Sequence, residues 1–169
     1  MILQAHTEVF ADIESFNGWV AETQKPLIRF CQQYLNCWAE AEDAAQEAFL
    51  RAWRKRDTFK GNSSLLTWQM AIARRVCLDR LRWFKRTFTV PLDEQRNLTA
   101  EPMFCEVNMD VQRTLETLSA EDRGILYLRV HEDLSFEEIC CILNLSPAAC
   151  RKRYERAKKR FKEVYIKEN

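Results

Sequence analysis

The chain has little glycine and proline. Only three of its 169 residues are glycine and four are proline. A phosphate-binding loop or a dinucleotide-binding turn needs clustered glycines, because the backbone must approach the phosphate closely. Strands joined by tight turns also need frequent glycine or proline. The scarcity therefore excludes the common nucleotide-binding loops and argues strongly against an all-β fold.

Patterns of catalysis and export are missing too. The two histidines are distant from each other, and no HExxH, GxSxG or CxxC pattern occurs, so hydrolytic and zinc-dependent chemistry have little support. No run approaches the roughly 20 apolar residues of a membrane span, and the N-terminus lacks the basic and apolar segments of a signal peptide. We expect a cytoplasmic protein without membrane insertion, catalytic residues, metal ligands or cofactor.

Cysteine, in contrast to glycine and proline, is abundant in this chain. The chain has seven cysteines, an odd number at irregular spacings, which is typical of reduced thiols in a cytosolic protein. The adjacent pair Cys140 and Cys141 leaves a redox or metal-sensing role open. The plainer interpretation is two small apolar residues in a helix.

The net charge of +1 conceals an alternation along the chain. Residues 1–48 carry eight acidic and two basic side chains (net −6), and residues 49–90 carry two and eleven (net +9). Residues 91–145 carry twelve and four (net −8), and residues 146–169 carry three and nine (net +6). Basic segments of this density suit a polyanion, because each base that neutralises a phosphate releases counterions. Two such segments predict two contacts with nucleic acid.

Apolar residues recur at helical spacing nearly throughout, which predicts an all-α fold. Pro26 is expected at the first position of its helix, and Ser63 or Ser64, Ser119, Ser135 and Ser146 are expected as caps. The expected helices cover residues 7–22, 26–36, 40–55, 64–86, 109–118, 120–131, 136–143 and 147–165. We expect two small helical domains, 1–87 and 110–169, joined by a flexible linker, 88–109, where the periodicity fades around Pro91 and Pro102.

The C-terminal unit has the pattern of a helix-turn-helix. A short helix is followed by the turn Asn144-Leu145-Ser146 and by a second helix that opens with Pro147. The second helix is expected to bury Cys150, Tyr154, Ala157 and Phe161 against Ile139, Ile142 and Leu145. Its opposite face carries Lys152, Arg156 and Lys159, beside Ala148, Arg151 and Arg153. Small residues in the first turn allow close approach to a groove, and the bases can reach phosphates and base edges.

Two helices of the N-terminal unit have unusual faces. The helix over 40–55 buries an alanine-rich stripe with Phe49 and Trp53, and leaves Leu50 among charged residues on the opposite face, as in a protein contact. The helix over 64–86 is apolar over most of its circumference, and we expect Trp68 and Trp83 on that side. Its remaining face is basic, and we expect Arg74 to be exposed there, so that its loss would barely change stability. Basic and aromatic residues together suit single-stranded DNA.

These segments carry a family resemblance. The segment AEDAAQEAFLRAW, followed by TFKGNSSLLTWQMAIARRVCLDRLR, resembles region 2 of bacterial RNA polymerase sigma factors of the extracytoplasmic-function (ECF) group. The segment LSAEDRGILYLRVHEDLSFEEICCILNLSPAACRKRYERAKKR resembles region 4 of the same group. This chain has Gln69 where the family usually has leucine after the Thr-Trp pair. The order of the two regions, and the missing domain between them, also fit.

The resemblance implies partners and site residues. The partners are RNA polymerase core, through the clamp helices of its largest subunit and its flap region, promoter DNA, and, as an open question, an anti-sigma protein. The polymerase contact is assigned to Asp43, Gln46, Glu47, Phe49, Leu50 and Arg54. Contacts with the minus-ten element are assigned to Phe59, Lys60, Asn62, Ser63, Ser64, Trp68, Arg74, Arg75, Arg82 and Lys85. Contacts with the minus-thirty-five element are assigned to Ser146, Ala148, Ala149, Arg151, Lys152, Arg153, Arg156 and Lys159.

The function expected is that of a sigma factor, which binds core polymerase and directs promoter recognition and transcription initiation. An alternative is a two-domain helix-turn-helix regulator that binds DNA without docking on polymerase. The exposed face with Asp43, Glu47 and Leu50 favours the first, since DNA binding alone has no use for it. A cysteine-based redox or metal sensor is a third hypothesis.

Overall fold

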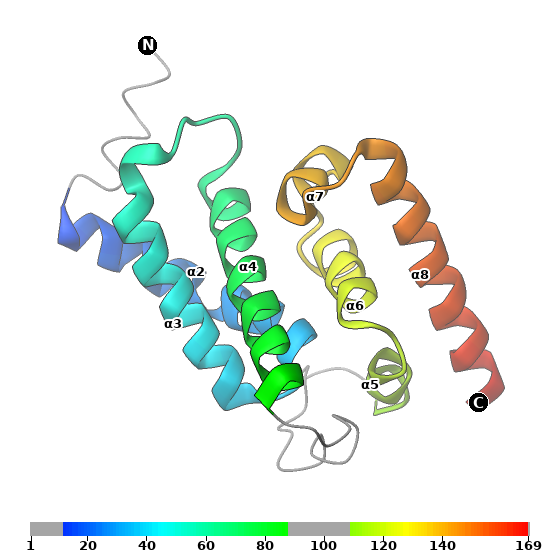
Figure 1. Cartoon of the computed structure of the whole chain (residues 1–169). Coiled ribbons are helices and arrows are strands. Elements are labelled where there is room, and N and C mark those ends of the chain that lie inside the picture. The colour runs from blue at the N-terminus through cyan, green and yellow to red at the C-terminus, as the bar shows by residue number, and fades with distance from the viewer. Residues whose placement is uncertain (1–11, 88–108, 169) are drawn as a thin grey trace.

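The computed structural model describes residues 12–87 and 109–168, and every element within them is helical (Figure 1). The elements are α2 (Ile13–Leu35), α3 (Trp38–Lys55), the 3₁₀ turn η1 (Arg56–Thr58), α4 (Leu65–Thr87), α5 (Met109–Glu116), α6 (Ala120–Leu126), the π-helical turn η2 (Tyr127–His131), α7 (Phe136–Leu143) and α8 (Pro147–Glu168). The predicted all-α fold of two small helical units is confirmed. The segment expected as a flexible linker, 88–109, lies outside the described residues except for Met109.

Helix α2 corrects one expectation, because it runs unbroken through Pro26. The carboxylate of Asp12 caps its first turn by accepting from the Ser15 amide at 2.7 Å, and Asn36 ends it at φ 54°. A proline inside a helix removes one backbone hydrogen bond and costs about 3 kcal/mol. Burial of Leu27 and Phe30 in the next turn offsets this cost, since both are fully buried. The expected break before Pro26 is therefore wrong.

Helices α3 and α4 bury the faces that their periodicity predicts, with one exception. The alanine-rich stripe of α3 is buried, and it allows α2 and α4 to pack closely on α3. Ser64 caps α4 by accepting from the Thr67 amide at 3.1 Å. Met70, Ala73, Val76 and Cys77 form the buried side of α4. Trp83 is the exception, because it is 51 % exposed near the C-terminal end of α4.

The C-terminal unit contains the predicted helix-turn-helix. Ser135 and Glu138 form a complete capping box at the start of α7. Asn144 then turns the chain at φ 51°, and α8 begins at Pro147. Helix α8 buries Cys150 and Ala157 fully, as predicted, whereas Tyr154 and Phe161, predicted on the same face, are half-buried. The helix expected over 120–131 is present in two parts. Its α-helical part, α6, ends at Leu126, and the wider π-helical turn η2 continues to His131.

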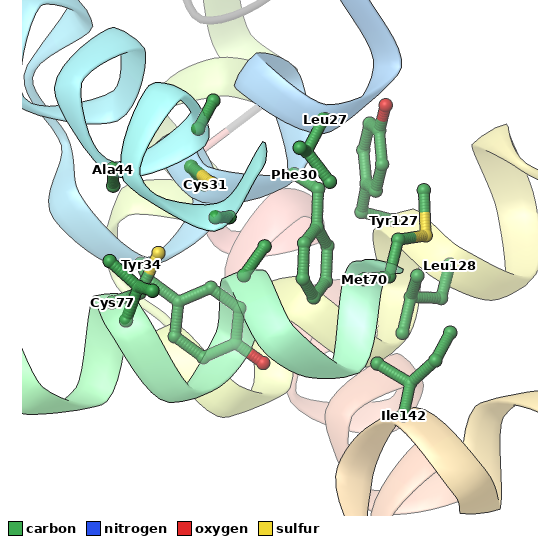
Figure 2. Close-up of a cluster of buried hydrophobic side chains, with 14 of the residues drawn as sticks. Leu27, Phe30, Cys31, Tyr34, Ala44, Met70, Cys77, Tyr127, Leu128 and Ile142 are labelled. Carbon is green, nitrogen blue, oxygen red and sulfur yellow. The ribbon is translucent and has the colours of Figure 1, made fainter. Parts of the chain in front are cut away.

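The two units share one core, which the sequence pattern does not predict. Helix α4 packs against α7, and α2 packs against α6 (Figure 1). Figure 2 shows Phe30 and Met70 of the N-terminal unit close to Tyr127, Leu128 and Ile142 of the C-terminal unit. All five side chains are at most 3 % exposed. The apolar contact between the units is therefore part of the main core.

Candidate nucleic-acid interface

One face of α3 is left outside the core. Asp43, Gln46, Leu50 and Arg54 have exposed side chains at successive helical turns, and Leu50 is 56 % exposed. An apolar side chain held among charged residues, on a helix whose opposite face is buried, is available for a partner protein. This is the arrangement predicted for the face that contains Leu50.

The other two residues assigned to this face are placed differently. Phe49 is 7 % exposed and lies between Phe16 and Trp19, with ring centroids at 6.4 and 5.7 Å. It therefore belongs to the buried stripe, as its periodicity predicts, and the polymerase contact assigned to it stays a prediction. The carboxylate of Glu47 pairs with Arg51 and lies 3.5 Å from Arg80 of α4. Glu47 therefore contributes to the contact between α3 and α4, and its side chain is also partly exposed to solvent.

The loop before α4 gathers several of the predicted minus-ten residues. Lys60, Asn62 and Ser64 are exposed, and Gly61 takes a positive φ of 70°. The half-buried rings of Phe59 and Trp68 are tilted against each other at a centroid distance of 5.3 Å. The loop thus presents polar side chains next to an aromatic pair.

The basic face of α4 is only partly open. Arg75 and Lys85 are exposed, and the guanidinium of Arg82 is mostly exposed while pairing with Asp79 at 3.1 Å. Arg74 is different: its side chain is only 14 % exposed, and it faces the C-terminal unit. The expectation of an exposed Arg74 is wrong, because α6 packs against this side of the N-terminal unit.

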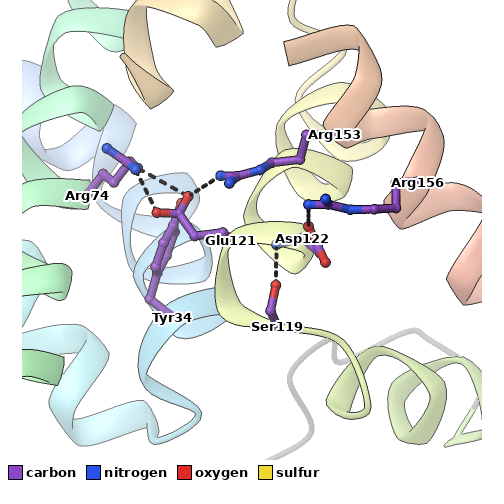
Figure 3. A network of polar contacts seen from close by, with 7 residues as sticks. All are labelled: Tyr34, Arg74, Ser119, Glu121, Asp122, Arg153 and Arg156. Atoms are coloured by element: carbon purple, nitrogen blue, oxygen red, sulfur yellow. Dashed lines mark hydrogen bonds and ion pairs between the residues drawn. The ribbon is translucent and has the colours of Figure 1, made fainter. Parts of the chain in front are cut away.

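A polar network around Glu121 of α6 joins both units (Figure 3). Arg74 donates to both Glu121 carboxylate oxygens, at 2.6 and 3.4 Å. Arg153 of α8 donates to the same carboxylate at 3.3 Å, and the Tyr34 hydroxyl lies 3.5 Å from it. Burial lowers the pKa of Arg74, but the hydrogen bond and charge of Glu121 outweigh this effect and raise it. Burial, with the charge of Glu121, raises the pKa of Tyr34. The Arg74 guanidinium therefore stays charged and the Tyr34 phenol stays neutral.

Helix α8 exposes most of its predicted DNA face. The exposed residues are Ser146, Ala148, Ala149, Arg151, Lys152, Arg156 and Lys159. The Ser146 hydroxyl caps the helix by accepting from the Ala149 amide at 3.3 Å. Arg153 is half-buried on Glu121, and a nitrogen of Arg156 lies 3.8 Å from the carboxylate of Asp122. Two of the five predicted arginines and lysines of α8 thus lie beside acids of α6.

Sequence reasoning missed the acids and the buried arginine at this junction. Glu121 and Asp122 have only the ordinary pattern of acids in the first turn of a helix. Arg123 is fully buried and donates to the carbonyl oxygens of Gln33 at 2.7 Å and Leu118 at 2.6 Å. No short motif marks these residues, because their partners are distant in sequence.

An apolar groove of about 370 Å³ lies between α5, η2 and α8. Its apolar lining comes from Val111, Leu115, Leu126, Val130, Tyr154 and Phe161. Val130 is 71 % exposed. The groove is thus open to a partner with apolar side chains.

The cysteines of the described residues are mostly packed inside. Cys31, Cys77, Cys140 and Cys150 are buried, and Cys141 is exposed. Burial, with a hydrogen bond to Cys140, raises the pKa of Cys150 to about 12. Among the described residues no group of three or more His, Cys, Asp or Glu could hold a metal ion. None of the described helices is long and apolar enough to cross a membrane.

Comparisons with known proteins match both units. The family model of sigma-70 region 2 matches residues 19–87, and that of sigma-70 region 4 matches residues 108–161. The chain is 27 % identical to the ECF sigma factor SigM of Mycobacterium tuberculosis over 160 residues, which cover 95 % of this chain and 81 % of SigM. It is 27 % identical to the ECF sigma factor SigW of Bacillus subtilis, with 90 % of this chain and 89 % of SigW covered.

A solved structure shares the fold. The sigma factor RpoE of Bartonella quintana, in complex with the anti-sigma factor NepR, superposes with a TM-score of 0.74 at 22 % identity, and the match covers 90 % of this chain and 97 % of RpoE. The two matched regions together span most of the chain, in the order that the helical units have here. This chain belongs to the sigma-70 family, as an RNA polymerase sigma factor of the extracytoplasmic-function group.

Proposed function

We propose that this sigma factor docks on core polymerase through the exposed face of α3 and recognises promoters through the α4 loop and α8. The observation that carries the proposal is the exposed α3 face. Leu50 is 56 % exposed there, although the alanine-rich stripe on the opposite side of α3 is buried. A regulator that binds DNA alone has no use for such a face. The protein has no catalytic centre in this proposal and works in the cytoplasm, where the polymerase is.

The polymerase contact is proposed to combine charge with one apolar anchor. Asp43 supplies a negative charge one helical turn from Gln46, and Leu50 follows four residues later. Charge complementarity speeds association, while a buried apolar anchor slows dissociation. Glu47 is less available than Asp43 for a contact with polymerase, because its carboxylate already pairs with Arg51 and Arg80.

The promoter contacts are proposed on two surfaces. Phe59 and Trp68, next to the polar loop before α4, offer an aromatic support for an unstacked base of the minus-ten element. The exposed first turns of α8 enter the major groove of the minus-thirty-five element. Ala148 and Ala149 allow close approach, and Lys152 reaches base edges.

The apolar groove between α5, η2 and α8 is proposed as the contact for the flap region of polymerase. Its lining is mostly apolar and includes one lysine, Lys158. An anti-sigma protein is a further candidate partner, since RpoE of Bartonella quintana is solved with one. Neither partner requires a catalytic residue of this chain.

A double variant of the α3 face tests the proposal. Asp43→Lys with Leu50→Asp changes two exposed side chains and leaves the buried stripe and Glu47 intact. We expect affinity for purified core polymerase to fall at least about tenfold, which corresponds to about 1.4 kcal/mol. The matched control is Glu22→Lys, which reverses an exposed charge on α2.

Transcription by core polymerase from a promoter library separates the two candidate functions. The wild type should start transcription at a defined subset of promoters, and the double variant should not. A folded double variant that binds polymerase as well as the wild type would overturn the α3 assignment. DNA binding without stimulation of transcription would favour the regulator that acts without polymerase.

A further inference from the structure

We propose that Phe136, at the start of α7, is a positioning residue for the promoter contact: its ring orders the guanidinium of Arg151 on α8 before DNA binds. The guanidinium carbon of Arg151 lies 5.7 Å from the centroid of the Phe136 ring. The proposal rests on the proposed function, because it needs Arg151 to contact the minus-thirty-five element. Phe136 acts on DNA only through Arg151.

Arg151 is placed differently from the other two arginines of the predicted DNA face of α8. Arg153 donates to Glu121 at 3.3 Å, and Arg156 lies 3.8 Å from Asp122, so both are directed at acids. Arg151 is exposed and lies over an aromatic ring instead. A cation–π contact uses the flat face of the guanidinium, whereas the N–H donors lie in its plane. The contact therefore orders Arg151 and leaves its donors available for a phosphate or a base edge.

The ring itself is held by both helices of the helix-turn-helix. Phe136 follows Ser135, whose capping box with Glu138 fixes the start of α7. Tyr154 of α8 meets the half-buried ring edge-on, with the centroids 5.5 Å apart and the planes at 76°. Tyr154 comes three residues after Arg151, so the two side chains lie on the same side of α8 and both reach the start of α7.

Arg129 of η2 supports the same ring from outside the helix-turn-helix. Its guanidinium carbon lies 5.5 Å from the Phe136 centroid. Its Nη1 donates to the carbonyl oxygen of Leu134 at 2.9 Å and lies 3.4 Å from the carboxylate of Asp133. Arg129 is thus tied to the loop before α7, and we assign it to the support of the ring rather than to DNA.

Ordering Arg151 in advance favours binding for an entropic reason. A long, exposed arginine loses rotamer freedom when DNA fixes it, and this loss opposes association. A ring that already restricts the side chain makes the loss on binding smaller. Because a cation–π contact at an exposed site is weak, we expect it to change DNA affinity by about two- to fivefold.

The first test compares variants of the full chain that lose one ring. Phe136→Leu removes the ring under Arg151. The matched control, Phe161→Leu, makes the same change at a half-buried ring of α8 that stacks on Tyr165. The probe is a DNA duplex that the wild type selects from a random-sequence pool, and fluorescence anisotropy measures its binding. We expect Phe136→Leu to bind about threefold more weakly, and Phe161→Leu to stay within about 1.5-fold of the wild type. Phe136→Tyr keeps the ring and should restore the affinity.

A double-mutant cycle separates positioning from a general structural role. In an Arg151→Ala chain, the further change Phe136→Leu should have no effect, because the side chain that the ring orders is already gone. In a Lys152→Ala chain, Phe136→Leu should still weaken binding by about threefold. A ring that only stabilised the fold would weaken both chains alike.

Nuclear magnetic resonance of the free chain gives a second readout. The order parameter of the Arg151 Nε–H group should be higher than that of Arg160, which is exposed on the same helix, and should fall to the Arg160 level in Phe136→Leu. Circular dichroism checks that helix content is kept. Should Phe136→Leu lose helix content, the wild type decides alone through the comparison of Arg151 with Arg160.

Three results overturn the positioning role: an unchanged affinity of Phe136→Leu, an equal loss in the Arg151→Ala and Lys152→Ala chains, or an Arg151 as mobile as Arg160 in the wild type. Any of these with intact DNA selection by the wild type refutes Phe136 alone and leaves the proposed function standing. A wild type that selects no DNA sequence, with Arg151 ordered, would refute the promoter contact of α8 and the positioning role with it.

Discussion

Arg74 shows how one side chain can have two roles. Its position on a basic face predicts a DNA contact, and the structure pairs it with Glu121 at 2.6 Å. The side chain is 14 % exposed, so the pair is shielded from water. Removing Arg74 leaves Arg153 as the remaining cationic partner of the partly buried Glu121 carboxylate, and losing one partner of a shielded charge is destabilising. A stability effect is therefore expected in addition to any effect on DNA binding.

We expect Arg74→Ala to lower the free energy of unfolding by about 1–3 kcal/mol. The neighbouring Arg75 is exposed, so Arg75→Ala should change the free energy of unfolding by less than about 0.5 kcal/mol. Urea denaturation of both variants, side by side with the wild type, checks this. Equal stabilities of the two variants would show that the Arg74 pair contributes nothing to the folded chain.

Gln69 is the second informative side chain. It is fully buried on α4, and neither its amide oxygen nor its amide nitrogen has a hydrogen-bond partner among the described residues. Burial of an unpaired amide is unfavourable, because its hydrogen bonds with water are lost without replacement. A leucine at this position has no polar group to bury and would avoid that cost.

Gln69→Leu should therefore raise the free energy of unfolding by about 1–3 kcal/mol. The matched control is Gln24→Leu on the exposed side of α2, where no such gain is expected. Thermal denaturation followed by circular dichroism measures both. A lower melting temperature for Gln69→Leu would mean that the amide is satisfied in solution, for instance by water.

Among the helices, α8 separates its functions along its length. Its start, capped by Ser146, carries small residues and Lys152, whereas Lys159 lies two turns further and is 80 % exposed. In a helix-turn-helix the start of the second helix contacts base edges. Contacts with phosphate fix the orientation and carry no sequence information. We therefore expect Lys152 to contact base edges and Lys159 to contact phosphate.

Lys152→Ala should reduce the preference among minus-thirty-five sequences, since a good bidentate base contact discriminates by about 1–3 kcal/mol. Lys159→Ala should weaken all sequences alike and lower the slope of log affinity against log salt by about one. Binding of the full chain to a panel of duplexes at several salt concentrations measures both effects. A change of sequence ranking in Lys159→Ala alone would require a different position of α8 in the groove.

The whole chain is held together by a junction that joins α2 and α4 to α6 and α7. Gly124 is central to it, because a side chain there would collide with the ring of Tyr34, which is 1 % exposed. Alanine is a better helix former than glycine by about 1 kcal/mol, so local preference favours Gly124→Ala. The close contact between Gly124 and Tyr34 disfavours the same substitution.

We expect the contact to dominate, so that Gly124→Ala lowers the melting temperature and opens the chain. The matched control is Gly18→Ala on α2, where a Cβ would meet nothing within 4 Å and helix preference alone should act. Thermal denaturation and scattering of both variants measure the two effects. A Gly124→Ala chain as stable and as closed as the wild type would show that α2 and α6 adjust without cost.

The sequence alone determined the helices, most of their caps and the family. The capping box at Ser135, the turn at Asn144 and the buried stripe of α3 depend on residues three or four positions apart, so local periodicity was sufficient to predict them. Boundaries were less certain: Pro26 marks a helix start in most contexts, and here burial of the following turn overrides it.

Only the tertiary structure decided which charged side chains are available. Arg74 and Glu121 are 47 residues apart in sequence, and Arg153 and Glu121 are 32 apart. No pattern within one helix distinguishes an arginine that faces solvent from one that faces a distant carboxylate. The difference depends on how α4, α6 and α8 pack around a shared core, and this packing places three arginines of the two proposed DNA surfaces beside two acids.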